Sequence, residues 1–268
     1  MTKIAFMAAL MLLATVTARA EGPPSEARWI ELRPMLFPGK TGFADGDEVM
    51  VINAPERAIE ASLVPVRISV NLPQTVHSYV KSISLVVDEN PAPLAATFHF
   101  TPDSGRADIE TRIRVNDYGY LHAVAETSDG KLYVVKTYVK AAGGCSAPMG
   151  KDAAAAMTRI GQMKFQQIGL FQPGAVNRGQ LMISHPNLTG MQMDQVTRLF
   201  APAHYIQSVA VTLDGKPVLT VDADISLSED PNFRFFFVPK AHSEMRVTVK
   251  DSQDKLFSES WKLGRRSS

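Results

Sequence analysis

Cys145 is the single cysteine of the chain, and it stands in a segment of small residues, Ala141-Ala-Gly-Gly-Cys-Ser-Ala-Pro148. Such a segment has little side chain to pack, and its glycine pair gives the backbone freedom. A lone cysteine is often a small buried hydrophobe, but buried cysteines normally lie within apolar strands. We therefore predict that Gly143 and Gly144 form a flexible arm, and that the arm carries the thiol clear of the folded body as a covalent attachment point.

The setting of Cys145 does not favour a nucleophilic enzyme. Such an enzyme holds a base beside the sulfur, and the histidine nearest to Cys145 in the sequence is the distant His122. An unassisted thiol with a pKa of about 8.5 is only a few per cent ionised at neutral pH, which suffices for a carrier that other enzymes load. We predict a carrier without a catalytic site, a metal or a resident cofactor.

Copper is the alternative that the methionines raise. His185 lies close in sequence to Met182, Met191 and Met193, and imidazole and thioether both suit Cu(I). The spacing is irregular, and methionines beside a loop more often fill gaps in a core. Copper binding is therefore a minor hypothesis, and we expect His185 and His204 to have structural roles.

The elements that must position the thiol have the pattern of strands. Short apolar or alternating runs, such as Val64–Val70 and Phe233–Val238, are separated by turn residues, and Asp129-Gly130 and Asp214-Gly215 are typical hairpin turns. The chain also repeats itself: Val80–Asp88 aligns with Ile206–Asp214. A second match in the same order pairs residues 124–133 with 247–257. These patterns predict one architecture built twice.

We expect an all-β protein with two immunoglobulin-like antiparallel β-sandwich domains, joined by a linker with a short helix. The helix should begin at an Asp152 cap and run through an alanine-rich stretch to Met163. A further helix is expected around Trp29, behind a Ser25 cap. The expected boundaries are 1–20 for a signal peptide, 21–140 and 164–268 for the two sandwiches, and 141–163 for the carrier segment with the linker helix.

Residues 1–20 have the three parts of a secretory signal: Lys3, an apolar run, and Ala18-Arg-Ala20. Removing them takes the formal charge from +1 to −1, a balance that does not suggest a nucleic-acid partner. No later stretch has the length and apolarity of a membrane span. We expect an exported protein in the periplasm that binds neither nucleic acid nor membrane.

The chain resembles a fusion of SoxY and SoxZ, the two subunits of a sulfur carrier in thiosulfate oxidation. In the first half, residues 47–65 and the sequence Gly143-Gly-Cys145 are similar to SoxY. In the second half the similarity to SoxZ lies in His185-Pro186, Thr189-Gly190, residues 202–206, 213–218 and Ser228-Glu-Asp-Pro231.

The resemblance implies that Cys145 holds a sulfane or sulfonated sulfur group, as a cysteine persulfide or a related disulfide, while periplasmic sulfur-oxidising enzymes act on it. It implies that the two domains pair within the chain. The chain also resembles a subgroup associated with quinoprotein dehydrogenases. The alternative function is therefore an accessory binding protein for such an enzyme, with an incidental thiol. The chain departs from SoxY in that a whole domain follows Cys145, which tethers the arm at both ends.

Overall fold

The structure is a computed structural model that describes residues 26–148, 153–194 and 197–264. Its helices are α1 (Ala27–Leu36), α2 (Ala153–Thr158) and a 3-10 helix, η1 (Pro102–Ser104). Its strands are β1 (Phe43–Asp45), β2 (Met50–Asn53), β3 (Val64–Val70), β4 (Val80–Val87), β5 (Leu94–Phe100), β6 (Ile109–Ile113), β7 (Gly119–Thr127), β8 (Leu132–Val139), β9 (Met163–Ile168), β10 (Asn177–Ile183), β11 (Ile206–Leu213), β12 (Lys216–Ala223), β13 (Asn232–Phe237), β14 (Ser243–Asp251) and β15 (Leu256–Leu263). The predicted signal peptide, 1–20, and the predicted caps Ser25 and Asp152 lie outside the described residues.

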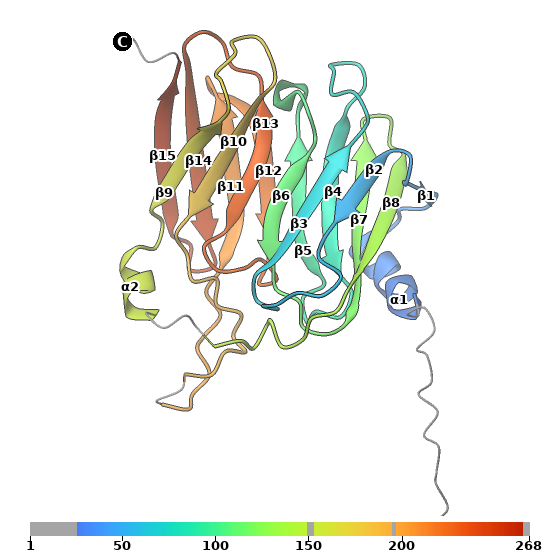
Figure 1. The fold of residues 1–268 in the computed structure, drawn as a ribbon, viewed down its shortest axis with the longest axis vertical. Helices are drawn as coiled ribbons and strands as arrows, with labels where there is room; N and C mark the ends of the chain where they lie inside the picture. Colours follow the sequence, from blue (N-terminus) through green and yellow to red (C-terminus); the bar gives the residue numbers. More distant parts are fainter. Residues whose placement is uncertain (1–25, 149–152, 195–196, 265–268) are drawn as a thin grey trace, which may run out of the picture.

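The strands form two sheets that face each other across one core (Figure 1). One sheet has nine strands in the order β1-β8-β7-β4-β5-β12-β11-β14-β15, and the other has six in the order β2-β3-β6-β13-β10-β9. Residues alternate between the core and the outside along β3 and β10, as the period of a strand with one buried face requires. The all-β prediction is confirmed.

The internal repeat is visible in the strand order. Reading outward from the junction of β5 and β12, the nine-stranded sheet shows β5-β4-β7-β8 on one side and β12-β11-β14-β15 on the other. The six-stranded sheet repeats the relation, with β6-β3-β2 opposite β13-β10-β9. The two halves are therefore related by an approximate two-fold axis, and the aligned segments Val80–Asp88 and Ile206–Asp214 are the equivalent strands β4 and β11 with the residue that follows each.

The halves join edge to edge, whereas we expected two separate sandwiches packed against each other. Strand β12 pairs with β5 over five residue pairs from Leu219–Phe100 to Ala223–Ala96, so the larger sheet crosses the junction without a break. The core is also continuous, because the rings of Phe98 and Phe233 meet across the seam at 6.3 Å. Edge pairing removes two exposed strand edges, which is the physical advantage of this arrangement.

Both predicted helices exist, with different bounds. In α1, Trp29 and Leu32 pack on the outer face of the larger sheet, and the Trp29 ring stacks on His122 with 4.2 Å between centroids. The linker helix α2 ends at Thr158, and the predicted extension to Met163 is wrong because Met163 begins β9. No helix in the described part of the chain is long and apolar enough to cross a membrane.

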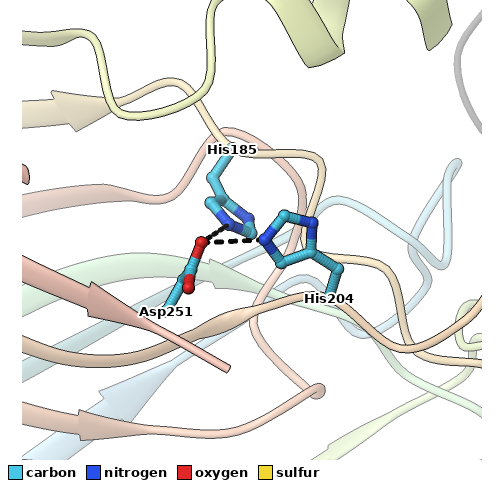
Figure 2. Close-up of side chains that lie close together, drawn as sticks. All are labelled: His185, His204 and Asp251. Carbon is cyan, nitrogen blue, oxygen red and sulfur yellow. Dashed lines mark hydrogen bonds and ion pairs between the residues drawn. The ribbon is translucent and has the colours of Figure 1, made fainter. Parts of the chain in front are cut away.

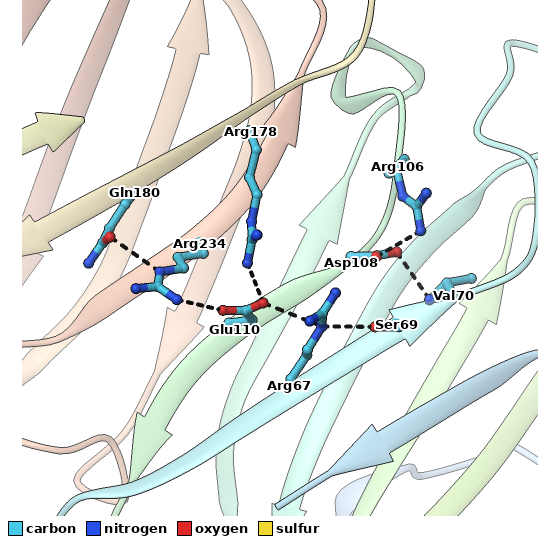
Figure 3. Close-up of polar contacts among 9 residues, drawn as sticks. All are labelled: Arg67, Ser69, Val70, Arg106, Asp108, Glu110, Arg178, Gln180 and Arg234. Atoms are coloured by element: carbon cyan, nitrogen blue, oxygen red, sulfur yellow. Dashed lines mark hydrogen bonds and ion pairs between the residues drawn. The ribbon is translucent and has the colours of Figure 1, made fainter. Parts of the chain in front are cut away.

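A charged cluster spans the seam on the outer face of the smaller sheet, where β6 and β13 share a single ladder pair (Figure 3). Glu110 of β6 forms ion pairs with Arg67, Arg178 and Arg234, and the last two belong to the second half. The Glu110 side chain is 20% exposed, so these pairs are partly shielded from water. One carboxylate therefore joins guanidinium groups of both halves at the point where the backbone ladder is weakest.

We predict that Glu110→Gln lowers the free energy of unfolding by about 1–2 kcal/mol at low salt, since three arginines would face one another without the carboxylate. The loss should shrink in about 1 M NaCl, where charge repulsion is screened. Urea unfolding at the two salt concentrations measures this. Glu244→Gln, which removes an exposed pair with Arg246, is the control and should change stability little; equal effects of the two variants would contradict the assigned role.

Candidate functional site

Cys145 lies in the connection between β8 and α2, and Figure 1 shows this connection running along the lower edge of the sandwich. Its relative exposure is 0%, and the thiol is free and buried. The prediction of a thiol standing clear of both domains is therefore wrong for this conformation. The segment is covered on both sides, by the end of β6 from the first half and by the loop 185–192 from the second.

Backbone hydrogen bonds hold the segment against the chain that follows β6. Gly143 N–H donates to the carbonyl of Asn116 at 2.8 Å, and Gly144 N–H donates to the carbonyl of Val115 at 2.9 Å. On the other side, the Thr189 hydroxyl donates to the carbonyl of Cys145 at 2.6 Å. The segment that we predicted to be a flexible arm is thus docked by both halves of the protein.

The two glycines are needed for different reasons, and flexibility explains neither. Gly143 has a φ of +79°, in the left-handed region where side chains are disfavoured, with open space around it. Gly144 is buried, and a Cβ there would lie 2.1 Å from the carbonyl oxygen of Ala61 and 2.6 Å from that of Val115. The close approach of two backbones, which only glycine permits, lets Cys145 sink into the seam.

Arg114 is the charged group next to this segment. Its side chain is 2% exposed, and one of its terminal nitrogens, Nη1, donates to the Gly144 carbonyl at 3.2 Å. Burial raises the pKa of the Cys145 thiol to about 11, and the positive charge of Arg114 opposes this rise. At pH 7 only about one thiol in ten thousand is then ionised, so the docked cysteine is a poor nucleophile.

The second half contributes a turn around Asn187, a residue with a φ of +44°. The carbonyl of Asn187 accepts from Arg114 Nη2 at 3.4 Å, and its side chain reaches the backbone of Ile206 and Leu227. Thr189 follows on the same turn. The covering of Cys145 therefore depends on the position of this loop, which is set by residues far away in the sequence.

His185, the first residue of this loop, and His204 meet at Asp251, the last residue of β14 (Figure 2). The carboxylate oxygen Oδ2 of Asp251 is 2.8 Å from His204 Nε2 and 3.7 Å from His185 Nε2, and all three side chains are at most 2% exposed. Burial, followed by the proximity of His204, lowers the pKa of His185 to about 4, while Asp251 opposes the shift. The prediction that both histidines have structural roles agrees with this arrangement.

Three such ligand atoms within 4.8 Å of one another have the residue types of a metal site. However, His185 Nδ1 accepts a hydrogen bond from the backbone N–H of Asn187 at 3.1 Å, so in the neutral ring the proton lies on Nε2, the nitrogen that faces Asp251. That nitrogen then offers no lone pair to a cation. We conclude that the group anchors the base of the loop 185–192, through the hydrogen bond between His204 and Asp251 and the close approach of His185.

Of the methionines in the copper hypothesis, Met182 does not lie with His185 in the buried group. Met182 lies on the outward face of β10, where it lines a hollow with Arg112 and Lys164, whereas His185 is buried. His185 instead contacts Asn187, His204 and Asp251. The position of Met182 therefore gives the copper hypothesis no support.

Sequence reasoning missed Arg114, Asn187 and Thr189. Arg114 follows the alternating strand Ile109–Ile113 at a position that the alternation assigns to the outer, solvated side. It is buried because the segment 141–146 and the loop 185–189 cover it, and no local pattern carries that information. Thr189 was noted only for its similarity to SoxZ.

Together, fold and site define a tandem β-sandwich protein with one thiol docked at the seam between its halves. Residues 36–145 match the family model of the sulfur oxidation protein SoxY, and residues 170–262 match that of the sulphur oxidation protein SoxZ, so the two models cover about three quarters of the chain. The chain therefore belongs to the sulfur-oxidation carrier family and joins SoxY and SoxZ in one polypeptide. The SoxY match ends at Cys145 itself.

Solved structures show weaker likeness. SoxY from Chlorobium limicola f thiosulfatophilum is 25% identical with a TM-score of 0.36, over 43% of this chain and 97% of its own. A superoxide reductase (neelaredoxin) from Ignicoccus hospitalis is 21% identical with a TM-score of 0.32, over 34% of this chain and 79% of its own. The fibronectin(III)-like modules of Clostridium thermocellum CbhA are 15% identical with a TM-score of 0.23, over 80% and 92%. No curated protein matches the chain.

We predict that Gly144→Ala lowers the free energy of unfolding by about 2–3 kcal/mol, because the new methyl group would overlap two carbonyl oxygens that cannot move independently. Gly143→Ala should cost about 1 kcal/mol, the usual penalty for a side chain at positive φ. Thermal or urea unfolding of the two variants measures the difference. A freely flexible arm would tolerate both substitutions equally.

The free energy of unfolding should fall by up to about 3 kcal/mol as the pH falls from about 6.5 to about 4. In this range His185 binds a proton in the unfolded chain but stays neutral in the folded protein. Hydrogen bonds from His204 and from backbone amides lower the pKa of Asp251 against the effect of its burial, so its own contribution is lost only below about 3.8. Urea unfolding of wild type and His185→Gln across this range measures the effect. The variant should show a flatter profile, and His77→Gln, at an exposed position, should keep the wild-type slope.

Proposed function

We propose that this protein is a periplasmic carrier that holds sulfur intermediates covalently on the thiol of Cys145 and presents them to separate enzymes, without catalytic chemistry of its own. The single observation that carries the proposal is the match to SoxY that ends on Cys145, followed in the same chain by a SoxZ domain. The export signal predicted at residues 1–20 supports the compartment. Burial keeps the docked thiol protonated, which is compatible with a passive role.

A carrier with a buried thiol needs two conformations. In the docked conformation the thiol is protonated and shielded, so it neither oxidises readily nor reacts with stray thiols. Release requires breaking the contacts that hold Gly143, Gly144 and Cys145, each worth about 1 kcal/mol net. Such an opening costs a few kcal/mol, well within the range of local unfolding in native proteins.

The burial of Cys145 also favours a second candidate, an accessory protein for a periplasmic quinoprotein dehydrogenase in which the thiol is only part of the core. In that case the sandwich surfaces would recognise the enzyme and no sulfur would be carried. Intact-mass spectrometry of the protein purified without reductant separates the two. Mass additions of sulfur atoms or of a thiosulfonate on Cys145 support the carrier, and a permanently unmodified thiol supports the accessory protein.

Cys145→Ser should abolish sulfur-dependent function in the producing cell, because no bond to cargo can form, whereas the accessory role predicts no loss. Growth on, or turnover of, a reduced sulfur compound measures this in cells that carry the variant in place of the wild type. Ser146→Ala is the matched control in the same segment and should keep full activity. Unfolding measurements should show that both variants remain folded.

Thr189→Val should speed the alkylation of Cys145 by iodoacetamide about five- to tenfold, because the Cys145 carbonyl loses its hydroxyl donor and the docked conformation is weakened by about 1 kcal/mol. Mass spectrometry at a series of times measures the rate. Thr248→Val, which removes an exposed hydroxyl contact with Ser258 between β14 and β15, is the control. An unchanged rate in Thr189→Val would mean that this contact does not hold the segment shut.

A further inference from the structure

Among the described residues that are no more than 2% exposed, Arg114 has the largest side chain, and a buried guanidinium is costly unless a negative charge compensates it. Among the described residues, no carboxylate lies within ion-pair distance of it; Glu60 and Glu229 act only from farther away. Its burial accordingly lowers the pKa of Arg114. The empty carrier therefore holds a cation at its seam without a matching anion.

The hydrogen bonds of Arg114 are also incomplete. The two terminal nitrogens donate to the carbonyls of Gly144 and Asn187 at 3.2 and 3.4 Å, longer than the usual 2.9–3.0 Å. Nε, although buried, has no partner among the described residues. A purely structural arginine would normally be satisfied at this depth, so the guanidinium retains donor capacity beside the segment that bears Cys145.

On the basis of the proposed function, we infer that Arg114 binds the anionic end of the sulfur group carried on Cys145 and so holds the loaded segment at the seam. A thiosulfonate on the sulfur adds one negative charge and three oxygens that accept hydrogen bonds. The planar guanidinium donates to such oxyanions through two nitrogens at once, and these charge-assisted bonds exceed those to neutral carbonyls. Cargo would thus supply the charge that the empty protein lacks.

Cargo binding would replace a weak contact of Arg114, its long hydrogen bond to the Gly144 carbonyl. The segment has no spare room at Gly144, so a loaded Cys145 must lie farther out than the free thiol. Such a shift gives up the long bond from Arg114 to Gly144 O and replaces it with a bond to the cargo. Arg114 is therefore a binding residue for anionic cargo. Uncharged or cationic groups on the same sulfur should not be stabilised by it.

The test compares charged adducts on Cys145. Tetrathionate loads the anionic cargo: the thiolate attacks an inner sulfur, a sulfur–sulfur bond forms to give Cys–S–S–SO3⁻, and thiosulfate leaves with the electron pair of the broken bond. With methanethiosulfonate reagents the thiolate attacks the sulfenyl sulfur, a disulfide bond forms to a sulfonatoethylthio or a trimethylammonioethylthio group, and methanesulfinate leaves with the electron pair of the broken bond; the two adducts are a matched pair of opposite charge. In each case sulfinate or thiosulfate is the leaving group, and mass spectrometry confirms the adduct.

In the wild type, both anionic adducts should melt about 2–4 °C above the cationic adduct, which corresponds to about 1 kcal/mol in a protein of this size. In Arg114→Gln the difference should vanish, and in Arg114→Lys part of it should remain. Arg112→Gln, two residues away on the outer side, is the control and should keep the wild-type difference. If Arg114→Gln does not fold, the inference is still tested by the difference in melting temperature between the anionic and cationic adducts in the wild type and in Arg114→Lys.

Equal melting temperatures for the wild-type anionic and cationic adducts, or a difference that persists in Arg114→Gln, would overturn the inference. Either result would leave the carrier proposal standing, since Cys145 would still have been loaded. Failure of every reagent to modify Cys145 in the native wild type, while the urea-unfolded chain reacts fully, would instead count against the carrier itself. The two failures are therefore distinguishable.

Discussion

The antiparallel pairing of β5 with β12 is the interaction on which the rest of this structure depends. It joins strands of the two similar halves into one continuous nine-stranded sheet, and it places the cores of the halves in contact across the seam. Backbone pairing fixes register as well as distance, because a slip of one residue would turn buried side chains outward. The loop 185–192 of the second half is thereby held over the end of β6 in the first, which is where the thiol lies.

This seam makes the thiol site a shared property of both halves. The SoxY part supplies Cys145 and Arg114, and the SoxZ part supplies Asn187 and Thr189 to cover them. Both halves therefore contribute to the covering of the cysteine, and the fusion keeps the two parts at a fixed ratio. The anchor of His185, His204 and Asp251 has its place in this scheme, since it holds the base of the covering loop.

Burial and carriage place opposite demands on the same residue. A carrier needs a thiol that other proteins can reach, while a thiol in an oxidising compartment is safest when it is protonated and covered. The segment that bears Cys145 is held by a few polar attachments at the edge of the sandwich, which is compatible with the opening that the proposed function requires. In the role that we propose for Arg114, the position of this segment depends on whether Cys145 is loaded.

The sequence by itself determined the strands, the internal repeat, the family resemblance and the identity of Cys145 as the residue of interest, because alternation, turn pairs and motifs are local signals. The tertiary structure alone decided that the halves share their sheets and that the glycine segment is docked. A glycine has the same sequence signature whether it provides flexibility or lets two backbones touch, and Gly144 does the second. The burial of Arg114 likewise could not be predicted from the sequence. It arises from segments about 30 and 70 residues away, which meet Arg114 only in the folded protein.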